Sequence, residues 1–160
     1  MADQDQSRTV LRNRLLGWGL AAAPTQPNVD IGRDITLTDG PNGRDFARVV
    51  GMDALVQDLY VAFTTVLGGD LFNTTFGFDG LRALVEETNP ILVRERVRIS
   101  AIQVLRKDPR IRRVIDVNLG GGALERVDAG ANRQLEVRIG FETVSGDQAA
   151  ADLGRLAFDG

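Results

Sequence analysis

The sequence contains no cysteine and no histidine among its 160 residues. Their absence excludes disulfide bonds, thiol nucleophiles, Cys/His zinc sites and any catalytic arrangement that needs His or Cys. Carboxylates, hydroxyls, Lys107 and Tyr60 are the groups left for acid–base chemistry. A hydrolase would therefore need a carboxylate pair or a metal ion held by oxygen ligands. We expect a protein that is not an enzyme and that uses no cofactor or metal.

Long apolar runs are also missing, since none approaches the roughly 20 residues that cross a bilayer. The apolar segment 15–23 follows an acidic start at Asp3 and Asp5, which is not the pattern of a secretory signal peptide. The composition is 43% hydrophobic and 26% charged, which is typical of a globular domain with a sizeable core. We expect no membrane span and a protein that is cytoplasmic when synthesised.

Composition divides the chain into three parts. Residues 1–29 predict an N-terminal arm, in which a short amphipathic helix would run through the only Trp as far as Leu20 and end at an Ala run before two prolines. Such an arm would dock either on its own domain or on a partner. Residues 30–144 carry the regular hydrophobic patterns of the main domain. Residues 145–160 are small, acidic and weakly patterned, and predict a C-terminal tail.

Within the main domain, turn residues and hydrophobic periodicity predict a β-hairpin, a helical middle and a second hairpin. The loop 70–80 contains three Phe residues that we expect to anchor it to the core, and 120–132 would be a long hairpin loop. The fold class is therefore α+β, a small mostly antiparallel sheet from two hairpins with two main helices packed on one face. The expected strands cover 31–37, 45–50, 111–119 and 133–144, and the expected helices cover 52–67, 81–87 and 90–107.

Positive charge is concentrated between residues 94 and 113. Eight basic residues stand there against two carboxylates, a local charge of +6 in a chain whose net charge is −3. Arg94 and Arg98 would share a helix row within its apolar arc, with Glu95 able to pair with Arg98. A basic side chain on an apolar face must extend to water, pair with a carboxylate or meet a partner. The candidate docking residues are Arg94, Arg98, Lys107, Asp108, Pro109, Arg110, Arg112 and Arg113.

Several short motifs recur in a fixed order. They are Arg33–Leu37 before a Gly-rich turn, Val50-Gly51 before a helix with Gln57, Thr64-Thr65 before Gly68-Gly69, Phe76-Gly77 near Leu81, and a long helix ending at Asp108-Pro109-Arg110. Over residues 30–141 the chain resembles the GPW-type baseplate wedge, or sheath-initiator, family of contractile phage tails, type VI secretion systems and contractile injection systems. The family motif Glu-Pro-Arg has Asp108 in its first position here, which shortens the carboxylate's reach by one methylene.

The resemblance implies a structural role, in which the protein links the baseplate wedges to the first sheath ring and initiates sheath assembly. It implies a core like the interlocking domain of a sheath subunit, several copies in a ring, and assembly into a particle or virion tail. Other wedge subunits would meet the basic residues, with Arg110 making a bidentate contact. The sheath protein would add a strand at a sheet edge, either 133–144 or its neighbour. The inner tube or hub could meet the N-terminal arm.

Two other functions stay open at this point. A lysozyme-like peptidoglycan hydrolase would act through paired carboxylates about 5–10 Å apart, chosen from Asp79, Glu86, Glu87 and Glu95. Adjacent Glu86 and Glu87 on a short helix are expected to point to different sides and to be solvated. Nucleic-acid binding through the basic residues is disfavoured, because the whole chain is acidic and the basic helix lacks interleaved aromatics.

Overall fold

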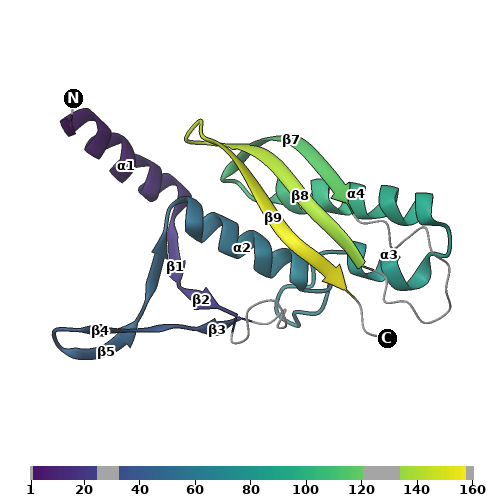
Figure 1. Cartoon of the computed structure of the whole chain (residues 1–160), viewed down its shortest axis with the longest axis horizontal. Coiled ribbons are helices and arrows are strands. Elements are labelled where there is room, and N and C mark those ends of the chain that lie inside the picture. Colours follow the sequence, from purple (N-terminus) through teal and green to yellow (C-terminus); the bar gives the residue numbers. More distant parts are fainter. Residues whose placement is uncertain (1, 25–32, 121–133, 158–160) are drawn as a thin grey trace. The chain divides into compact units, whose positions relative to one another are not determined.

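The computed structural model describes residues 2–24, 33–120 and 134–157, which contain four helices and several short antiparallel sheets (Figure 1). The predicted α+β class is confirmed. The chain forms two compact units, Met1–Asp58 and Leu59–Gly160. Helix α2 (Met52–Thr64) begins in the first unit and ends in the second. Nearly all of the predicted loop 120–132 lies outside the described residues.

The first unit begins with helix α1 (Ala2–Leu16). The helix ends at Gly17, whose N–H donates to the carbonyl of Asn13 at 2.9 Å and whose φ is +85°. That left-handed conformation is common just after a helix, and glycine adopts it without steric cost. The chain then enters strand β1 (Trp18–Leu20). The prediction that the arm's helix would continue through Trp18 to Leu20 was wrong, because Gly17 ends it.

Three two-stranded ribbons follow α1. They are formed by β1 with β6 (Arg48–Val50), β2 (Ala22–Ala23) with β3 (Asp34–Ile35), and β4 (Leu37–Gly40) with β5 (Gly43–Phe46). The hairpin predicted around the turn 38–43 is confirmed by the pairing of β4 with β5. The two strands within the predicted N-terminal arm were not expected, because segment 18–23 is short and four of its six residues are Ala or Gly.

The three ribbons meet at a junction of backbone hydrogen bonds. Each of the three extended segments bends at one residue, where it leaves one partner strand and joins another. Ala21 donates to Ala47 at 2.8 Å, Ala47 donates to Thr36 at 3.0 Å, and Thr36 donates to Ala21 at 2.9 Å. The cycle pairs the backbone groups that would otherwise be left open where the strands separate.

Gln57 completes the outer edge of this junction. Its side-chain oxygen accepts from the N–H of Ala22 at 2.9 Å, and its side-chain NH₂ donates to the carbonyl of Leu20 at 2.8 Å. The amide group therefore supplies to the β1–β2 segment the two hydrogen bonds that a neighbouring strand would supply. This contact ties the first turns of α2 to the ribbons.

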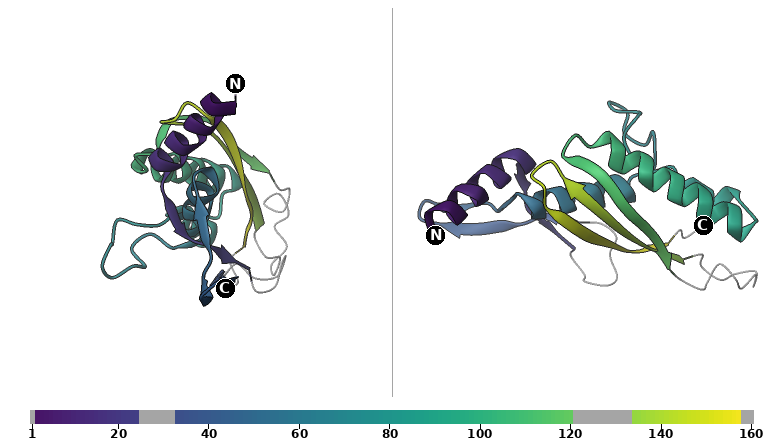
Figure 2. Two further views of the ribbon diagram at one scale, coloured as in Figure 1. Left: turned by 90° about the vertical axis from the view of Figure 1, so that its left-hand side faces the viewer. Right: turned by 90° about the horizontal axis from the view of Figure 1, so that it is seen from above.

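The second unit contains a three-stranded antiparallel sheet in the order β7-β8-β9, together with helices α3 and α4 (Figure 2). Helix α4 packs against β7, and α3 packs against α4. Asn89 caps α4 by accepting the N–H of Ile91 at 2.9 Å, and Pro90 occupies the first helical position, where its missing N–H costs nothing. The bounds are Gly80–Glu86 for α3, Pro90–Lys107 for α4, Ile111–Gly120 for β7, Gln134–Thr143 for β8 and Gln148–Ala157 for β9.

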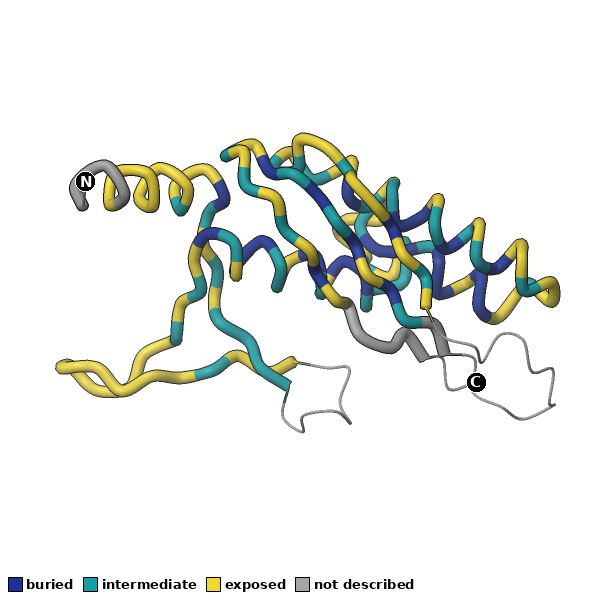
Figure 3. Tube along the Cα trace, turned by 45° about the horizontal axis from the view of Figure 1, so that its top comes forward, coloured by how far each residue is buried: buried dark blue, intermediate teal, exposed yellow. Residues whose placement is uncertain are grey.

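The core of the second unit lies between the helices and the sheet. One row of α4 is buried, consisting of Val93, Val97, Ala101 and Leu105, at a spacing of four residues. Figure 3 shows this row along α4 and the alternating burial along the strands. The remaining core is aromatic and aliphatic, with Leu59, Phe63, Phe78, Leu81, Leu84, Val117, Val137, Ile139 and Phe141 fully or almost fully buried.

The C-terminal segment differs from the expected tail. Residues Gln148–Ala157 form strand β9, which pairs with β8 from Gln134↔Ala157 to Glu142↔Gln148. Gly146, with a φ of +86°, allows the tight turn that precedes it. The segment escaped prediction because its many Ala residues have low strand propensity, so pairing with β8 decides its conformation.

Candidate functional site

The junction between α4 and β7 contains the most specific polar contacts among the predicted docking residues. The helix ends at Lys107, and Asp108 adopts an extended conformation with ψ of 116°, as expected for a residue before proline. The Asp108 Oδ1 atom accepts the backbone N–H and the Nε–H of Arg110, both at 2.9 Å. Its Oδ2 accepts from Nη2 of Arg110 at 2.7 Å. The side chain of Asp108 is 14% exposed and that of Arg110 is 23% exposed.

The bidentate contact expected of Arg110 is thus made within the chain. Asp108 is short enough to accept the N–H two residues ahead while its second oxygen still reaches the guanidinium. Burial of the Asp108 carboxylate raises its pKa, but the hydrogen bonds and charge of Arg110 lower it more, so the pKa of Asp108 lies below its ordinary value of 3.8. The pair therefore stays ionised at neutral pH.

A β-bulge brings the next two arginines to one carboxylate. Ile111 pairs with Thr143 and Arg113 pairs with Glu142, so Arg112 is an extra residue on β7. Adjacent strand residues normally point to opposite faces, but a bulge changes that alternation. Arg112 Nη1 lies 3.4 Å from Glu142 Oε1, and Arg113 Nη2 lies 2.8 Å from Oε2. Both arginine side chains are about two-thirds exposed, at 69% and 66%.

Three of the other predicted docking residues, Arg94, Arg98 and Lys107, lie on α4. Lys107 donates to the carbonyl of Thr75 at 3.0 Å and so ties the loop after α2 to the end of α4. Arg98 pairs with Glu95 at 2.6 Å, which confirms the predicted i,i+3 contact. Arg94 and Arg98 are half-buried and border the buried row of the helix. Pro109 is exposed in the turn.

Arg96 is a central polar residue that the docking prediction omitted. Its guanidinium lies 2.9 Å from Glu86, 3.3 Å from Asp79 and 3.7 Å from Glu87. The hydrogen bond to Glu86, with further help from Asp79, raises the pKa of Arg96 despite some desolvation. The signal in the sequence was the group of acidic residues at 79, 86 and 87, which needed a cation.

This contact corrects the expectation that Glu86 and Glu87 point to different sides, although Glu86 is exposed to solvent as expected. Both carboxylates approach the same guanidinium, because α3 ends at Glu86 and Glu87 is extended, with φ of −90° and ψ of 133°. Three of the four carboxylates considered for hydrolysis are therefore gathered around one arginine, and the fourth, Glu95, pairs with Arg98.

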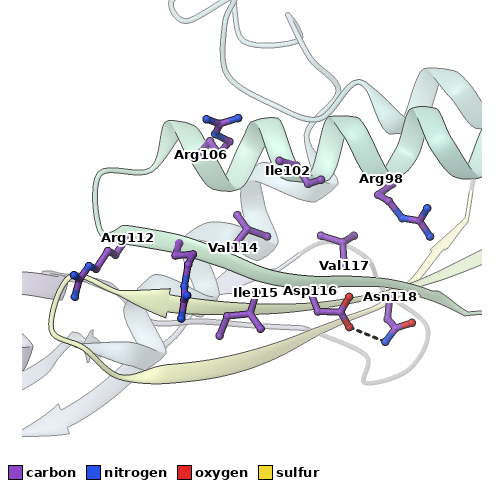
Figure 4. A pocket seen from close by; sticks show the side chains of 10 residues that line it. Arg98, Ile102, Arg106, Arg112, Val114, Ile115, Asp116, Val117 and Asn118 are labelled. Atoms are coloured by element: carbon purple, nitrogen blue, oxygen red, sulfur yellow. Dashed lines mark hydrogen bonds between the residues drawn. The ribbon is translucent and has the colours of Figure 1, made fainter.

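A groove lies between α4 and β7, the first strand of the sheet. It has a volume of about 610 Å³ and is lined by Arg98, Ile102 and Arg106 of α4 and by residues 112–118 of β7. Figure 4 shows Val114 and Val117 pointing from β7 toward α4, with Asp116 and Asn118 on the other side of the strand. Asn118 donates to Asp116 at 2.9 Å. Four arginines are thus among the residues that line the groove, at an outer strand of the sheet.

The order of the strands in the sheet corrects one prediction about where a partner strand would add. The segment 133–144 was one of the two expected edges, but β8 is the central strand and is paired on both sides. Its neighbours β7 and β9 are the outer strands of the described sheet. A central strand and an outer strand can show the same alternation of apolar and polar residues. The sequence alone therefore could not tell which of these strands lies at the edge of the sheet.

The Phe-containing loop is anchored through Phe78 and exposed at its tip. Phe78 is fully buried and its ring centre lies 4.9 Å from that of Phe63. Phe76 is half-buried, whereas Leu71 and Phe72 at the tip are 89% and 101% exposed. The prediction that all three Phe side chains anchor the loop was therefore wrong for Phe72.

Two other kinds of feature are absent from the described parts of the chain. No group of three or more acidic side chains there is arranged to hold a metal ion. No helix there is both long enough and apolar enough to traverse a bilayer. Compared with known proteins, the sequence matches no protein-family model and no curated protein.

Proposed function

We propose that the protein is a structural subunit of the baseplate of a contractile particle, which links wedge subunits to the first sheath ring and starts sheath assembly. The observation that carries this proposal is the groove beside β7, where an outer strand of the sheet lies next to a helix with apolar and basic side chains. An extended segment can add to such an edge through main-chain hydrogen bonds, while its alternate side chains enter the groove.

The charge of the groove defines the segment that fits it. Arg98 and the Arg112–Arg113 pair already share carboxylates, whereas Arg106 has no ion pair with any described residue. An added strand with a carboxylate facing Arg106 would gain an exposed or half-buried charge pair. The incoming sheath arm should therefore have apolar residues alternating with acidic ones.

The turn at Asp108–Arg110 has a supporting role in this proposal. Because Arg110 is held by Asp108, the pair helps to fix the path of the chain from α4 into β7, the two elements that line the groove. The exposed arginines on the bulge, Arg112 and Arg113, are the better candidates for contact with neighbouring wedge subunits. A ring of copies would make such individually weak contacts cooperative, since each bound contact raises the local concentration of the next.

The test is sheath assembly on purified protein with a charge reversal in the groove. Arg106→Glu should lower the rate of sheath nucleation at least about tenfold, a size expected for a lost charge pair at an interface. Arg8→Glu is the matched control, because Arg8 is exposed on α1 and makes no ion pair with the described residues. Equal nucleation by both variants and the parent protein would rule out the groove as the sheath site.

The same preparation tests the hydrolase interpretation. We expect no release of soluble fragments from peptidoglycan, because the carboxylates at the α3–α4 contact are paired with Arg96. Turnover that is abolished by Glu86→Gln would replace the structural proposal with an enzymatic one.

A further inference from the structure

The three ribbons of the first unit present one apolar face. In antiparallel strands, directly paired residues share a face and every second residue returns to it. Trp18 pairs with Val50, and Leu37 pairs with Phe46. Leu20 and Ile35 follow by alternation in their own segments. We call this set the ribbon face, and it consists of Trp18, Leu20, Ile35, Leu37, Phe46 and Val50.

Exposure follows the same alternation through the junction. All six side chains of the ribbon face are exposed, from 39% for Leu20 to 63% for Trp18. The residues between them, including Gly19, Ala21, Thr36, Ala47 and Val49, are half-buried. Figure 3 shows the β4–β5 ribbon exposed along its whole length. The apolar area left open is on the order of 500 Å², at the upper end for the largest patch of a monomeric protein.

Backbone hydrogen bonds keep this face ordered in the unbound chain. The cycle of hydrogen bonds through Ala21, Thr36 and Ala47 joins the three ribbons, and Gln57 fixes the edge of the β1–β2 segment. A surface that is already ordered loses little conformational entropy on binding. The apolar side chains of the ribbon face therefore lie on a backbone that is already ordered for binding.

The charges on the face indicate what covers it. Asp39 and Arg44 neutralise each other at 3.4 Å near the hairpin turn. Arg48 lies with its guanidinium carbon 5.0 Å from the centre of the Trp18 ring and has no ion pair with any described residue. The face thus offers one unneutralised cation within an apolar surface, and a partner with a carboxylate at that point fits it best.

A second copy of this chain fits less well. The exposed apolar residues of α1 are Val10, Leu11 and Leu15, and they are flanked by Arg8, Arg12 and Arg14. Docking α1 of another copy would bring these arginines toward Arg48, which costs free energy when the charges leave water. The charge pattern therefore favours a different protein.

We propose that the ribbon face is the docking surface for an amphipathic helix of a partner protein, with its apolar stripe over the six side chains and a carboxylate against Arg48. A sheet face is normally covered by a second layer, and a helix supplies a narrow apolar stripe of the right kind. This surface belongs to the first unit and the β7 groove to the second, and the proposal does not depend on the proposed function.

Site-specific cross-linking in the full chain tests where the partner lies. A photo-reactive phenylalanine analogue is placed at Leu37 or, as the matched control, at Thr38, which points to the other face of the same ribbon. We expect cross-links from position 37 and few from position 38, in the cells that make the protein. The cross-linked segment is sequenced, and it should be an amphipathic helix with Asp or Glu beside its apolar stripe. Equal cross-linking, no cross-linking at position 37, or a cross-link to this chain's own sequence overturns the proposal.

The sequenced segment is then synthesised with a fluorescent label and titrated with the purified full chain by anisotropy. Arg48→Glu and Leu37→Asp should each weaken binding at least about tenfold, while Thr38→Asp should change it less than about twofold. Far-UV circular dichroism checks that each variant is folded. Trp18 is the only Trp, so its emission should shift to shorter wavelength as the peptide covers it. Undiminished binding by the Arg48→Glu variant, or no change in Trp18 emission, overturns the proposal.

Discussion

The turn between α4 and β7 should depend on coupling between Asp108 and Arg110. The Asp108 carboxylate accepts three N–H groups of Arg110, one from the backbone and two from the guanidinium, at 2.7–2.9 Å. One hydrogen bond to a charged group contributes about 1.5–3 kcal/mol, and the three bonds to this one carboxylate are not additive. We therefore expect Asp108→Ala to lower the free energy of unfolding by about 2–3 kcal/mol.

Arg110→Ala should cost less, about 1–2 kcal/mol, because Asp108 keeps the backbone N–H as a partner. Combining the two substitutions isolates the side-chain interaction, and we expect a coupling free energy of about 1–2 kcal/mol. The assay is urea unfolding followed by far-UV circular dichroism, with all four proteins measured at pH 7. Additive effects, within about 0.5 kcal/mol, would refute the coupling and leave Asp108 as a simple helix-end residue.

The pH dependence gives an independent check with a defined sign. The pKa of Asp108 is lower in the folded protein than its ordinary value of 3.8, so the unfolded chain binds this proton more readily. The stabilisation is complete above that ordinary pKa and is lost as the pH falls through the lower folded pKa. The stability difference between the parent protein and Asp108→Asn should thus be constant at neutral pH and shrink below about pH 4. A difference that persists unchanged into strong acid would contradict the lowered pKa.

Three further predictions test other parts of the molecule. Gly77→Ala should destabilise the protein by about 2–4 kcal/mol in thermal unfolding, because φ is +107° and a Cβ would lie 2.7 Å from two backbone carbonyl oxygens. Gly146→Ala is the control, because there is open space around Gly146, and it should cost only about 1 kcal/mol. Equal losses of stability in the two variants would contradict the role of the close backbone approach at Gly77. Gln57→Ala should cost about 1–2 kcal/mol by removing two hydrogen bonds to the β1–β2 backbone, and an unchanged melting temperature would show that the clamp is dispensable. Arg96→Met should cost about 0.5–1 kcal/mol at low salt and less at 1 M salt, since the pair with Glu86 is partly exposed; a cost independent of salt would point to packing instead of charge.

Local signals were enough for the long elements of the second unit. Asn89-Pro90 starts α4 and Pro109 stops it, and the observed bounds, Pro90–Lys107, are the predicted ones. Strict alternation predicted β8 within one residue at each end. The bounds of these elements could be predicted because helix caps, proline geometry and period-two burial act over a few neighbouring residues.

The candidate site was less accessible from the sequence. The concentration of arginines was visible, but their partners were not, because the pairs of Arg96 with Glu86 and of Arg113 with Glu142 join residues far apart in the chain. The bulge that directs Arg112 and Arg113 to one carboxylate exists only once β7 is in register with β8. Pairing within the turn at Asp108 was near enough in sequence to be found, yet we assigned Arg110 to a partner.

The sequence by itself determined the α+β class, the span of α4, the hairpin around residues 38–43 and the absence of Cys and His chemistry. Each of these depends on residue type or on neighbours within a few positions. Tertiary structure alone decided that β8 is central, that β9 is a strand, that Phe72 is exposed and that three ribbons meet at one junction. Those outcomes depend on which backbone groups of distant segments pair with each other. The hydrogen bond between Ala21 and Ala47 is an example, because nothing in the identity of either residue predicts it.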